Sequence, residues 1–456
     1  MILLVVLILS LCACDAEPKW KPYTGNMEGY VYYYKTERER AWEEDVLSLA
    51  DTFLNEHPLL LNEKSPLKIY AIRGFVQSQE NLYNELLHYT FLTSINNLIP
   101  RLSELTDDQI PYELQKIVAA LGDFHSQVPL FVKYYFPMFV EPFYTDGAVE
   151  LRVVGVPSEH KEFIYSKLVS INDVGIDEVM KRLAPYGSVE NEYGLISRIT
   201  DFNLGGMLFH PGILTAAGIM KSEAESAVFG VETEDGKLHT ISIMPASEEQ
   251  LPNVDTEKRT IYRTYPYTFK DWQTDSYWYD LLPEDNAAYI RINRFSQESD
   301  ETLKEMCESL MSELREQEQI DKIIVDLRRN YGGYGMYEDF QRLTQVLRLP
   351  QITDACVLID HGSMSRSVSA AYQLKQEAEN VTLIGSPAGE GSFYIGLNDS
   401  DRTLPNSGVA YIIAKFATLL TKEKPFDALM PDITVYPTLE DYMNGVDTIL
   451  EAALSR

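Results

Sequence analysis

The segment Lys322–Gly335 reads KIIVDLRRNYGGYG, in which a run of apolar residues is followed by charged residues and two adjacent glycines. Comparable apolar runs are AAYIRI at 287–292, CVLID at 356–360 and VTLIG at 381–385. Apolar runs of this length are typical of strands that are buried on both faces of a sheet covered by helices. The segment therefore predicts a strand of a parallel or mixed sheet.

Helix-like stretches separate these strands. In ETLKEMCESLMSEL at 301–314 the apolar residues form one stripe, and VSAAYQLKQ at 368–376 is a second such stretch. Strands that alternate with helices predict an α/β fold, in which chemistry usually occurs at the carboxyl ends of the strands. The stretches RRNYGG at 328–333 and HGSMSRS at 361–367 both lie at such ends.

The rest of the chain has a different pattern. About one hundred residues before Ser126 have apolar residues at spacings of three and four, which predicts helices. From Gln127 to about Pro245 short β-like runs predict a mixed module, and 246–275 is the expected linker. The chain is thus predicted to be a multi-domain α+β protein, with the following parts: leader 1–19, helical domain 20–126, mixed β module 127–260 and α/β domain 261–456.

Composition restricts the classes of partner and cofactor. The chain has 39 lysine and arginine residues against 69 aspartate and glutamate residues, so its net charge of −30 excludes nucleic acid as an expected partner. A hydrophobic fraction of 45% is typical of a folded globular protein. Neither CxxC nor HExxH occurs, and we expect no metal and no cofactor.

The first residues, MILLVVLILSLCACDAEPKW, contain an apolar run too short to span a bilayer but suited to a signal peptide. LCAC, ending at Cys14, resembles the bacterial lipobox, in which the cysteine becomes the lipid-bearing first residue. No basic residue precedes Lys19, which departs from the usual signal. We expect an extracytoplasmic lipoprotein of the cell membrane, with a secreted chain as the alternative. Cys307 and Cys356 are expected to be buried thiols.

Several serines follow the strand that ends near Asp360. A serine at this strand-to-helix junction would lie at a positive helix end, which favours an oxyanion, and a glycine loop could supply further N–H donors. The combination is compatible with acyl transfer. Serine also caps helices for purely structural reasons.

Four linked motifs resemble the tail-specific, or carboxyl-terminal processing, serine proteases. IIVDLRRNYGG at 323–333 is similar to the family signature Asp-Leu-Arg-x-Asn-x-Gly-Gly, and YIRINRFS at 289–296 to the strand before it. LPNSG at 404–408 and the segment 430–454 resemble the family's carboxyl-terminal part. The resemblance covers 287–456 and implies a ClpP/crotonase-like protease domain.

The resemblance also implies a nucleophile. In this family it follows a Ser/Thr-x pair at the start of a helix, which selects Ser365, with Ser363 at the small-hydroxyl position and Ser367 as the close competitor. Gly332 or Gly333 and the N–H of Arg366 would form the oxyanion hole.

One branch of the family uses a lysine as general base, but Glu390 occupies that place here, so a Ser-Lys dyad is excluded. LGDFHS at 121–126 matches the Leu-x-Asp-x-His-Ser/Thr motif of a second branch, the tricorn-like proteases and their retinoid-binding relatives. This makes His125 the candidate base; a buried structural histidine is the alternative. Glu423 and Asp427 match that branch's acid loosely, so the third group stays open.

Two functions remain. The first is a serine endopeptidase that cleaves peptides or proteins; the second is an inactive peptide- or ligand-binding protein on the same fold. Val368 favours the second, because active relatives commonly have glutamate at that position. KLVSINDVGIDEV at 167–179 resembles the end of a PDZ domain, although the usual Gly-Asp is absent, so the module is expected to be a degenerate PDZ-like one.

Overall fold

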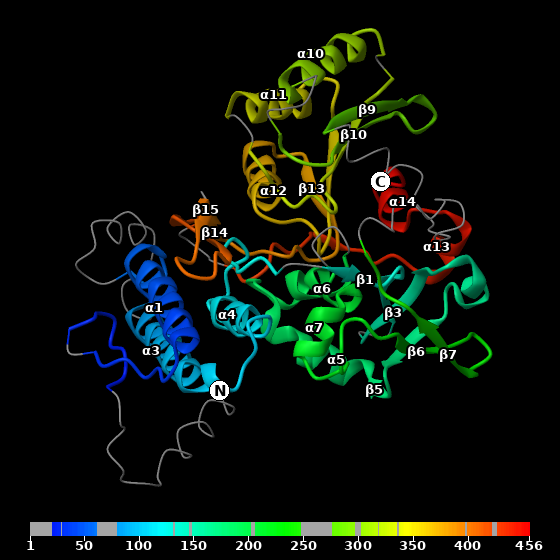
Figure 1. Cartoon of the computed structure of the whole chain (residues 1–456). Helices are drawn as coiled ribbons and strands as arrows, with labels where there is room; N and C mark the ends of the chain where they lie inside the picture. The colour runs from blue at the N-terminus through cyan, green and yellow to red at the C-terminus, as the bar shows by residue number, and fades with distance from the viewer. Residues whose placement is uncertain are drawn as a thin grey trace.

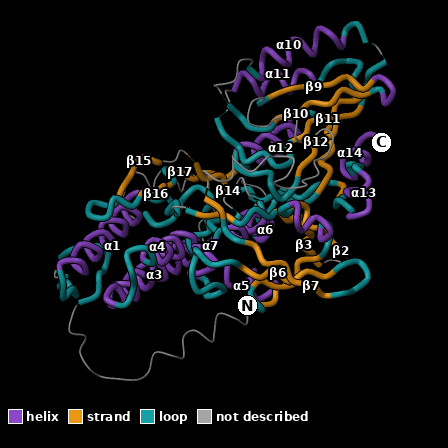
Figure 2. Tube along the Cα trace, turned by 45° about the vertical axis from the view of Figure 1, so that its right-hand side comes forward, coloured by secondary structure: helices purple, strands orange, loops and turns teal. Residues whose placement is uncertain are grey.

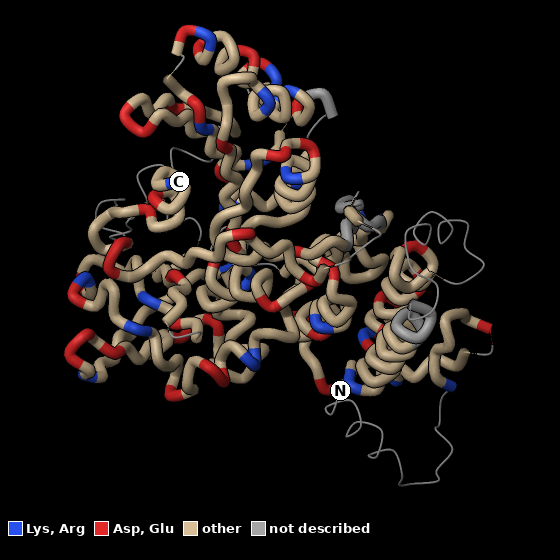
Figure 3. Tube along the Cα trace, turned by 180° about the vertical axis from the view of Figure 1, so that it is seen from behind, with Lys and Arg blue, Asp and Glu red and all other residues tan. Residues whose placement is uncertain are grey.

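The computed structural model has three parts: a group of N-terminal helices, a β-rich module, and a sheet covered by helices (Figure 1). Acidic residues are spread over all three parts rather than gathered at one place (Figure 3). The structure describes the residues 21–28, 30–61, 80–130, 133–145, 148–201, 206–247, 276–296, 302–317, 319–334, 337–396, 399–421 and 426–456.

A six-stranded sheet forms the centre of the C-terminal part. Its order is β18-β13-β12-β11-β10-β9, with β9 antiparallel at one edge and the other strands parallel. The α/β fold with buried parallel strands is confirmed. The strands are β9 (Tyr277–Leu282), β10 (Ala287–Ile292), β11 (Lys322–Asp326), β12 (Asp354–Ile359), β13 (Val381–Gly385) and β18 (Ile433–Thr434).

Helices cover both faces of this sheet (Figure 2). Alternate residues of β11 point to opposite faces: Ile323 packs with the helices α10, α11 and α12, whereas Ile324 packs with Ile449 of α14. Burial of such a side chain contributes about 1.5–3 kcal/mol, which explains why the strands are apolar throughout. The helices are α10 (Leu303–Leu314), α11 (Tyr337–Leu347), α12 (Arg366–Glu377) and α14 (Thr448–Leu454).

The N-terminal helices share their core with a hairpin from far along the chain. Leu404, Tyr411 and Ile413, next to or within β15 and β16, belong to the same apolar cluster as the helices. The carboxylate of Asp45 accepts the N–H groups of Asn406 and Ser407. The elements are α1 (Glu37–Glu56), α3 (Glu80–Leu98), η1 (Ile99–Ser103), α4 (Ile110–Ala119), β15 (Asp399–Thr403) and β16 (Ala410–Ile413).

The β-rich module is an antiparallel sheet of order β2-β3-β4-β6-β7, with β5 paired to β4. The segment 167–183 forms a strand, a turn and a helix: Asn172 and Asp173 have positive φ and join β4 to β5 before α5. The elements are β2 (Phe139–Thr145), β3 (Ala148–Gly155), β4 (Lys167–Ile171), β5 (Val174–Gly175), β6 (Ala227–Glu232), β7 (Leu238–Ile243), α5 (Ile176–Leu183), α6 (Glu192–Thr200) and α7 (Pro211–Ala216).

The C-terminal segment also contacts this module, because Tyr442 of α13 packs with Phe143 and Val154. The leader with Cys14 and most of the expected linker lie outside the described residues, and the domain boundaries stay predictions. Within the described ranges no helix is both long and apolar enough to cross a membrane. The remaining elements are β1 (Tyr134–Tyr135), β8 (Ala246–Ser247), β14 (Phe393–Gly396), β17 (Phe416–Leu419), α13 (Leu439–Asn444), η2 (Ser158–Phe163), η3 (Ala184–Tyr186), η5 (Met207–Phe209) and η6 (Pro283–Asp285).

Candidate active site

Ser365 lies at the junction between β12 and α12, where it is the N-cap residue of the helix. Its backbone has φ 52° and ψ −121°, a region that residues other than glycine rarely adopt. The turn before it is held by Ser363, whose Oγ accepts the N–H of Asp360 and donates to the carbonyl of Leu327. The Ser365 side chain makes no capping bond to α12 and is free for another partner.

The neighbouring serines have structural contacts instead. Ser367 donates to the carbonyl of Leu327, and Ser369 donates to the carbonyl of Arg366. Both are buried within α12, and Ser363 is fully buried beneath the turn. Among these four serines, the hydroxyl of Ser365 is the one placed toward a histidine.

His125 is that histidine. Its Nε2 lies 2.9 Å from Oγ of Ser365, although the two residues are 240 positions apart in the chain. His125 belongs to the loop that follows α4, and the carboxylate of Asp123 accepts its backbone N–H at 2.8 Å. The structure thus brings the two predicted side chains into hydrogen-bond contact.

Asp123 is a site residue that sequence reasoning missed. Its Oδ1 lies 3.7 Å from Nδ1 of His125, and its Oδ2 accepts a hydrogen bond at 3.0 Å from Nε2 of His57. Burial opposes ionisation of Asp123, but the contacts with His125 and His57 outweigh it and hold the pKa of the carboxyl below its usual range. The signal was its place two residues before the histidine within LGDFHS.

The environment of His125 favours its protonated form. Burial lowers the pKa of the imidazole, but the carboxylates of Asp123 and Glu390 raise it more, so that the net shift is upward from 6.5. Nδ1 of His125 has no hydrogen-bond partner among the described residues, and Asp123 is the carboxylate next to it. Asp123 is therefore suited to stabilise a positive charge on the ring.

We expect Asp123→Asn to lower the rate of peptide hydrolysis by about 10²-fold or more, because a neutral amide stabilises an imidazolium less than a carboxylate does. The acid limb of the pH–rate profile should move to lower pH, since the carboxylate that raises the pKa of His125 is lost. Fixed-time assays of peptide hydrolysis between pH 5 and 9 would measure both effects. An acid limb that stays in place would contradict this role, and Asp235→Asn, at an exposed turn, is the matched control.

The other two candidates for the third group are not brought to His125. The Asp427 side chain is exposed and forms no hydrogen bond with His125; its backbone carbonyl accepts the side-chain amide of Asn191. Glu423 lies outside the described residues. Asp123 is thus the carboxylate that the described structure places beside the ring.

Glu390 contacts the candidate nucleophile from the place where another branch of the family has lysine. Its Oε2 accepts the backbone N–H of Ser365 at 2.6 Å, and the side chain is buried. Burial, opposed by His125 and by that N–H, raises the pKa of Glu390. The carboxyl thus holds the strained backbone of Ser365. Because a glutamate stands at this position, no Ser-Lys dyad can form here.

The glycine loop approaches Ser365 closely. Gly332 has φ 96°, and a Cβ on it would lie 2.6 Å from Cβ of Ser365 and 2.8 Å from the backbone nitrogen of Arg366. Only glycine fits there. The N–H of Gly332 donates to Oδ1 of Asn330 at 2.8 Å, so this amide is already used. Gly333 and Arg366 are the other residues whose N–H groups the sequence predicts as oxyanion donors.

Val368 is a core residue. It is 1% exposed and belongs to the apolar cluster between the sheet and α10–α12. In this chain, the valine that replaces the glutamate of active relatives therefore packs in the core beneath α12. Within the described part of the chain, no group of three histidine, cysteine or acidic residues could hold a metal ion, and Cys307 and Cys356 are buried thiols.

Comparisons with known proteins relate one segment of the chain to a protease family and its fold to solved structures. A sequence model of peptidase family S41 matches residues 286–338, which contain β10, α10, β11 and the glycine loop. The crystal structure of mature CPAF has 12% identity and a TM-score of 0.60, with 92% of this chain and 96% of that chain covered. Mature CPAF complexed with lactacystin has 12% identity and a TM-score of 0.59, with 92% and 98% covered.

No curated protein matches the chain in sequence. The likeness to CPAF shows the fold, and the family match covers the strand and the glycine loop next to Ser365. In residues 286–338 the chain is thus similar to peptidase family S41, the tail-specific serine proteases.

Proposed function

We propose that the chain is an extracytoplasmic, lipid-anchored serine endopeptidase in which Ser365 is the nucleophile and His125 the general base. The observation that carries the proposal is the 2.9 Å contact between Nε2 of His125 and Oγ of Ser365. Such a contact is what nucleophilic catalysis by a serine requires. A purely structural histidine would not need a partly exposed hydroxyl at a strained helix end.

In the reaction, Oγ of Ser365 attacks the peptide carbonyl carbon while its proton moves to Nε2 of His125. The carbonyl oxygen becomes an oxyanion, which the N–H groups of Gly333 and Arg366 face in this proposal. The imidazolium, stabilised by Asp123, then gives its proton to the leaving amine as the C–N bond breaks. Water, deprotonated by the same nitrogen, hydrolyses the acyl-enzyme and restores Ser365.

The second candidate is an inactive peptide-binding protein. The buried carboxyl of Glu390 favours it, because a negative charge beside the N–H of Ser365 opposes a developing oxyanion. Labelling of the full chain by a fluorophosphonate, together with turnover of a mixed peptide library followed by mass spectrometry, separates the two. Labelling with new peptide termini supports the peptidase, whereas peptides bound without either would support the binding protein.

The proposal also includes membrane attachment through Cys14, which lies outside the described residues. We expect the wild-type chain expressed in a bacterium to partition into detergent, because a lipid chain contributes about 0.8 kcal/mol per buried methylene group. Cys14→Ser should remain in the aqueous phase, whereas Cys12→Ser should partition like the wild type. Detergent partitioning with mass spectrometry of the N-terminus measures this. An unlipidated wild-type product would contradict it.

A further inference from the structure

A small cavity of about 200 Å³ lies behind the loop that carries His125. Residues 127–130, which directly follow that loop, form one wall, and residues of α4, α6 and α7 together with the segments 186–188 and 207–210 form the others. Two of the lining residues, Arg198 and His210, carry buried hydrogen-bond donors that have no partner among the described residues. The cavity therefore has room for a ligand next to hydrogen-bond donors that have no acceptor in the described part of the chain.

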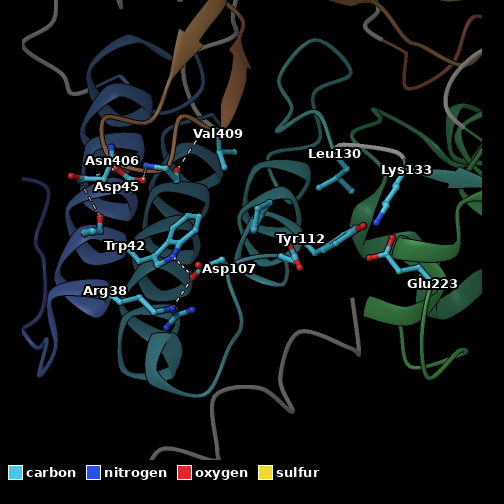
Figure 4. A pocket seen from close by; sticks show the side chains of 14 residues that line it. Arg38, Trp42, Asp45, Asp107, Tyr112, Leu130, Lys133, Glu223, Asn406 and Val409 are labelled. Atoms are coloured by element: carbon cyan, nitrogen blue, oxygen red, sulfur yellow. Dashed lines mark hydrogen bonds and ion pairs between the residues drawn. The ribbon is translucent and has the colours of Figure 1, made fainter. Parts of the chain in front are cut away.

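A larger cavity of about 740 Å³ adjoins it, since Leu130 lines both. In the larger cavity Arg38 and Trp42 both donate to Asp107 (Figure 4). Asp45 accepts from Asn406 in the same view. Several polar groups of the larger cavity thus have partners in its own walls, whereas Nε of Arg198 and Nε2 of His210 at the smaller cavity have none among the described residues.

His210 presents one donor. It is 2% exposed, and its Nδ1 accepts the N–H of Ile213 at 3.2 Å as the N-cap of α7. Because Nδ1 is the acceptor, a neutral ring carries its proton on Nε2. Burial lowers the pKa of His210 to about 4, which keeps the ring neutral near pH 7. Nε2–H is thus a buried donor without an acceptor in the described structure.

Arg198 presents the second donor and a positive charge. One of its terminal nitrogens donates to the backbone carbonyl of Phe124 at 3.1 Å, and the guanidinium lies 4.1 Å from the centroid of the Phe124 ring. Its Nε is buried and has no hydrogen-bond partner among the described residues, and Arg198 forms no ion pair with any of them. Burial lowers the pKa of Arg198 to about 10 despite the fields of Glu390 and Asp123. The guanidinium therefore lacks a direct counter-ion.

We propose that this cavity binds a carboxylate, whose oxygens accept from Arg198 and from Nε2 of His210. A buried donor normally has an acceptor, and a guanidinium is best matched by a carboxylate. One water molecule occupies about 30 Å³ in the liquid. The cavity is therefore large enough for a short carboxylate and not only for a single water molecule. Gln115 is already satisfied, because it binds Tyr186, Ser188 and Val128.

The carboxylate can come from a free short acid or from an acidic side chain of a peptide. The second source rests on the proposed function, because a peptide that reaches Ser365 would pass the loop whose continuation lines the cavity. The bond from Arg198 to Phe124, next to His125, connects the cavity with the active-site loop. Both sources share one chemistry, and the experiment distinguishes them.

The test uses the full chain with Ser365→Ala, which cannot turn a peptide over. Isothermal titration calorimetry at pH 8 would compare sodium propionate, acetyl-Ala-Glu-Ala-amide and acetyl-Ala-Gln-Ala-amide. We expect the Glu peptide to bind at least about 10-fold tighter than the Gln peptide, the effect of one charge-assisted contact. Propionate that binds and competes with the Glu peptide would show that a free acid uses the same site; propionate binding alone would assign the site to the free acid.

Adding Arg198→Met should abolish the preference and the propionate binding, and His210→Asn, which keeps an N-cap acceptor but loses the Nε2 donor, should weaken both. Arg182→Met, at an exposed arginine of α5 that pairs with Glu178, should leave them unchanged. Near-UV circular dichroism checks that each variant is folded. Equal binding of the two peptides without propionate binding, or a preference that survives Arg198→Met, overturns the proposal. Fluorophosphonate labelling of the wild type tests the peptidase separately.

Discussion

Replacement of Ser365 by alanine should abolish covalent labelling by a fluorophosphonate and reduce peptide hydrolysis by about 10⁴-fold to 10⁶-fold. The reason is that Oγ of Ser365 is the hydroxyl in contact with Nε2 of His125, and an alanine cannot form the acyl-enzyme. The helix should persist, because the Ser365 side chain makes no capping bond that the substitution would remove. Labelling detected by intact-mass spectrometry and turnover of a fluorogenic peptide would be measured in parallel.

Ser369→Ala is the matched control within the same helix. Its hydroxyl donates to the carbonyl of Arg366, one turn away from the site, so labelling and turnover should remain close to those of the wild type. Ser367→Ala tests the competitor that the sequence left open, and it should also retain labelling. Labelling that survives Ser365→Ala, or that is lost in Ser367→Ala while the protein stays folded, would refute the assignment of the nucleophile.

His125→Ala should reduce both labelling rate and turnover by about 10²-fold to 10⁴-fold, the usual contribution of a general base. In the wild type the neutral imidazole is the active form. The pKa of His125 is raised above 6.5, so activity should be complete at higher pH and fall as the pH decreases through that raised value. Rates measured between pH 5 and 9 would show this acid limb in the wild type and its absence in the variant.

His239→Ala, at an exposed histidine of β7, is the control and should change neither the rate nor the pH profile. The substitution at His125 leaves the acceptor Asp123 paired with His57, so the fold of the loop should be retained. A variant that keeps both the wild-type rate and the acid limb would show that His125 is not the base, and a structural role for the contact would then be the better explanation.

The sheet could be predicted because its strands carry their own signal. Ile323, Ile324 and Val325 are all buried since helices cover both faces of β11, and a continuous apolar run is the local consequence. The capping box of Thr302 and Glu305 likewise marks the start of α10 through bonds between near neighbours. Ser365 and His125 were found through motifs that the chain shares with a family, not through periodicity.

Contacts between distant segments had no such signal. The pairing of Asp123 with His57 depends on α1 and the loop after α4 meeting in space, and the association of β15 and β16 with the N-terminal helices places residues near 410 in a core that begins near Tyr23. The contact of Glu390 with the backbone N–H of Ser365 likewise joins two separate loops.

By itself, the sequence determined the local elements: which runs are apolar enough to become buried strands, where helices alternate with them, and which serine and histidine match a protease motif. Only the tertiary structure decided that these two side chains touch across 240 positions and that Asp123 lies beside the ring. It also decided that Arg198 and His210 line one cavity, each with one nitrogen that has no hydrogen-bond partner among the described residues. The physical reason is that periodicity reflects burial of neighbours along the chain, whereas a site is made by packing that brings distant loops together.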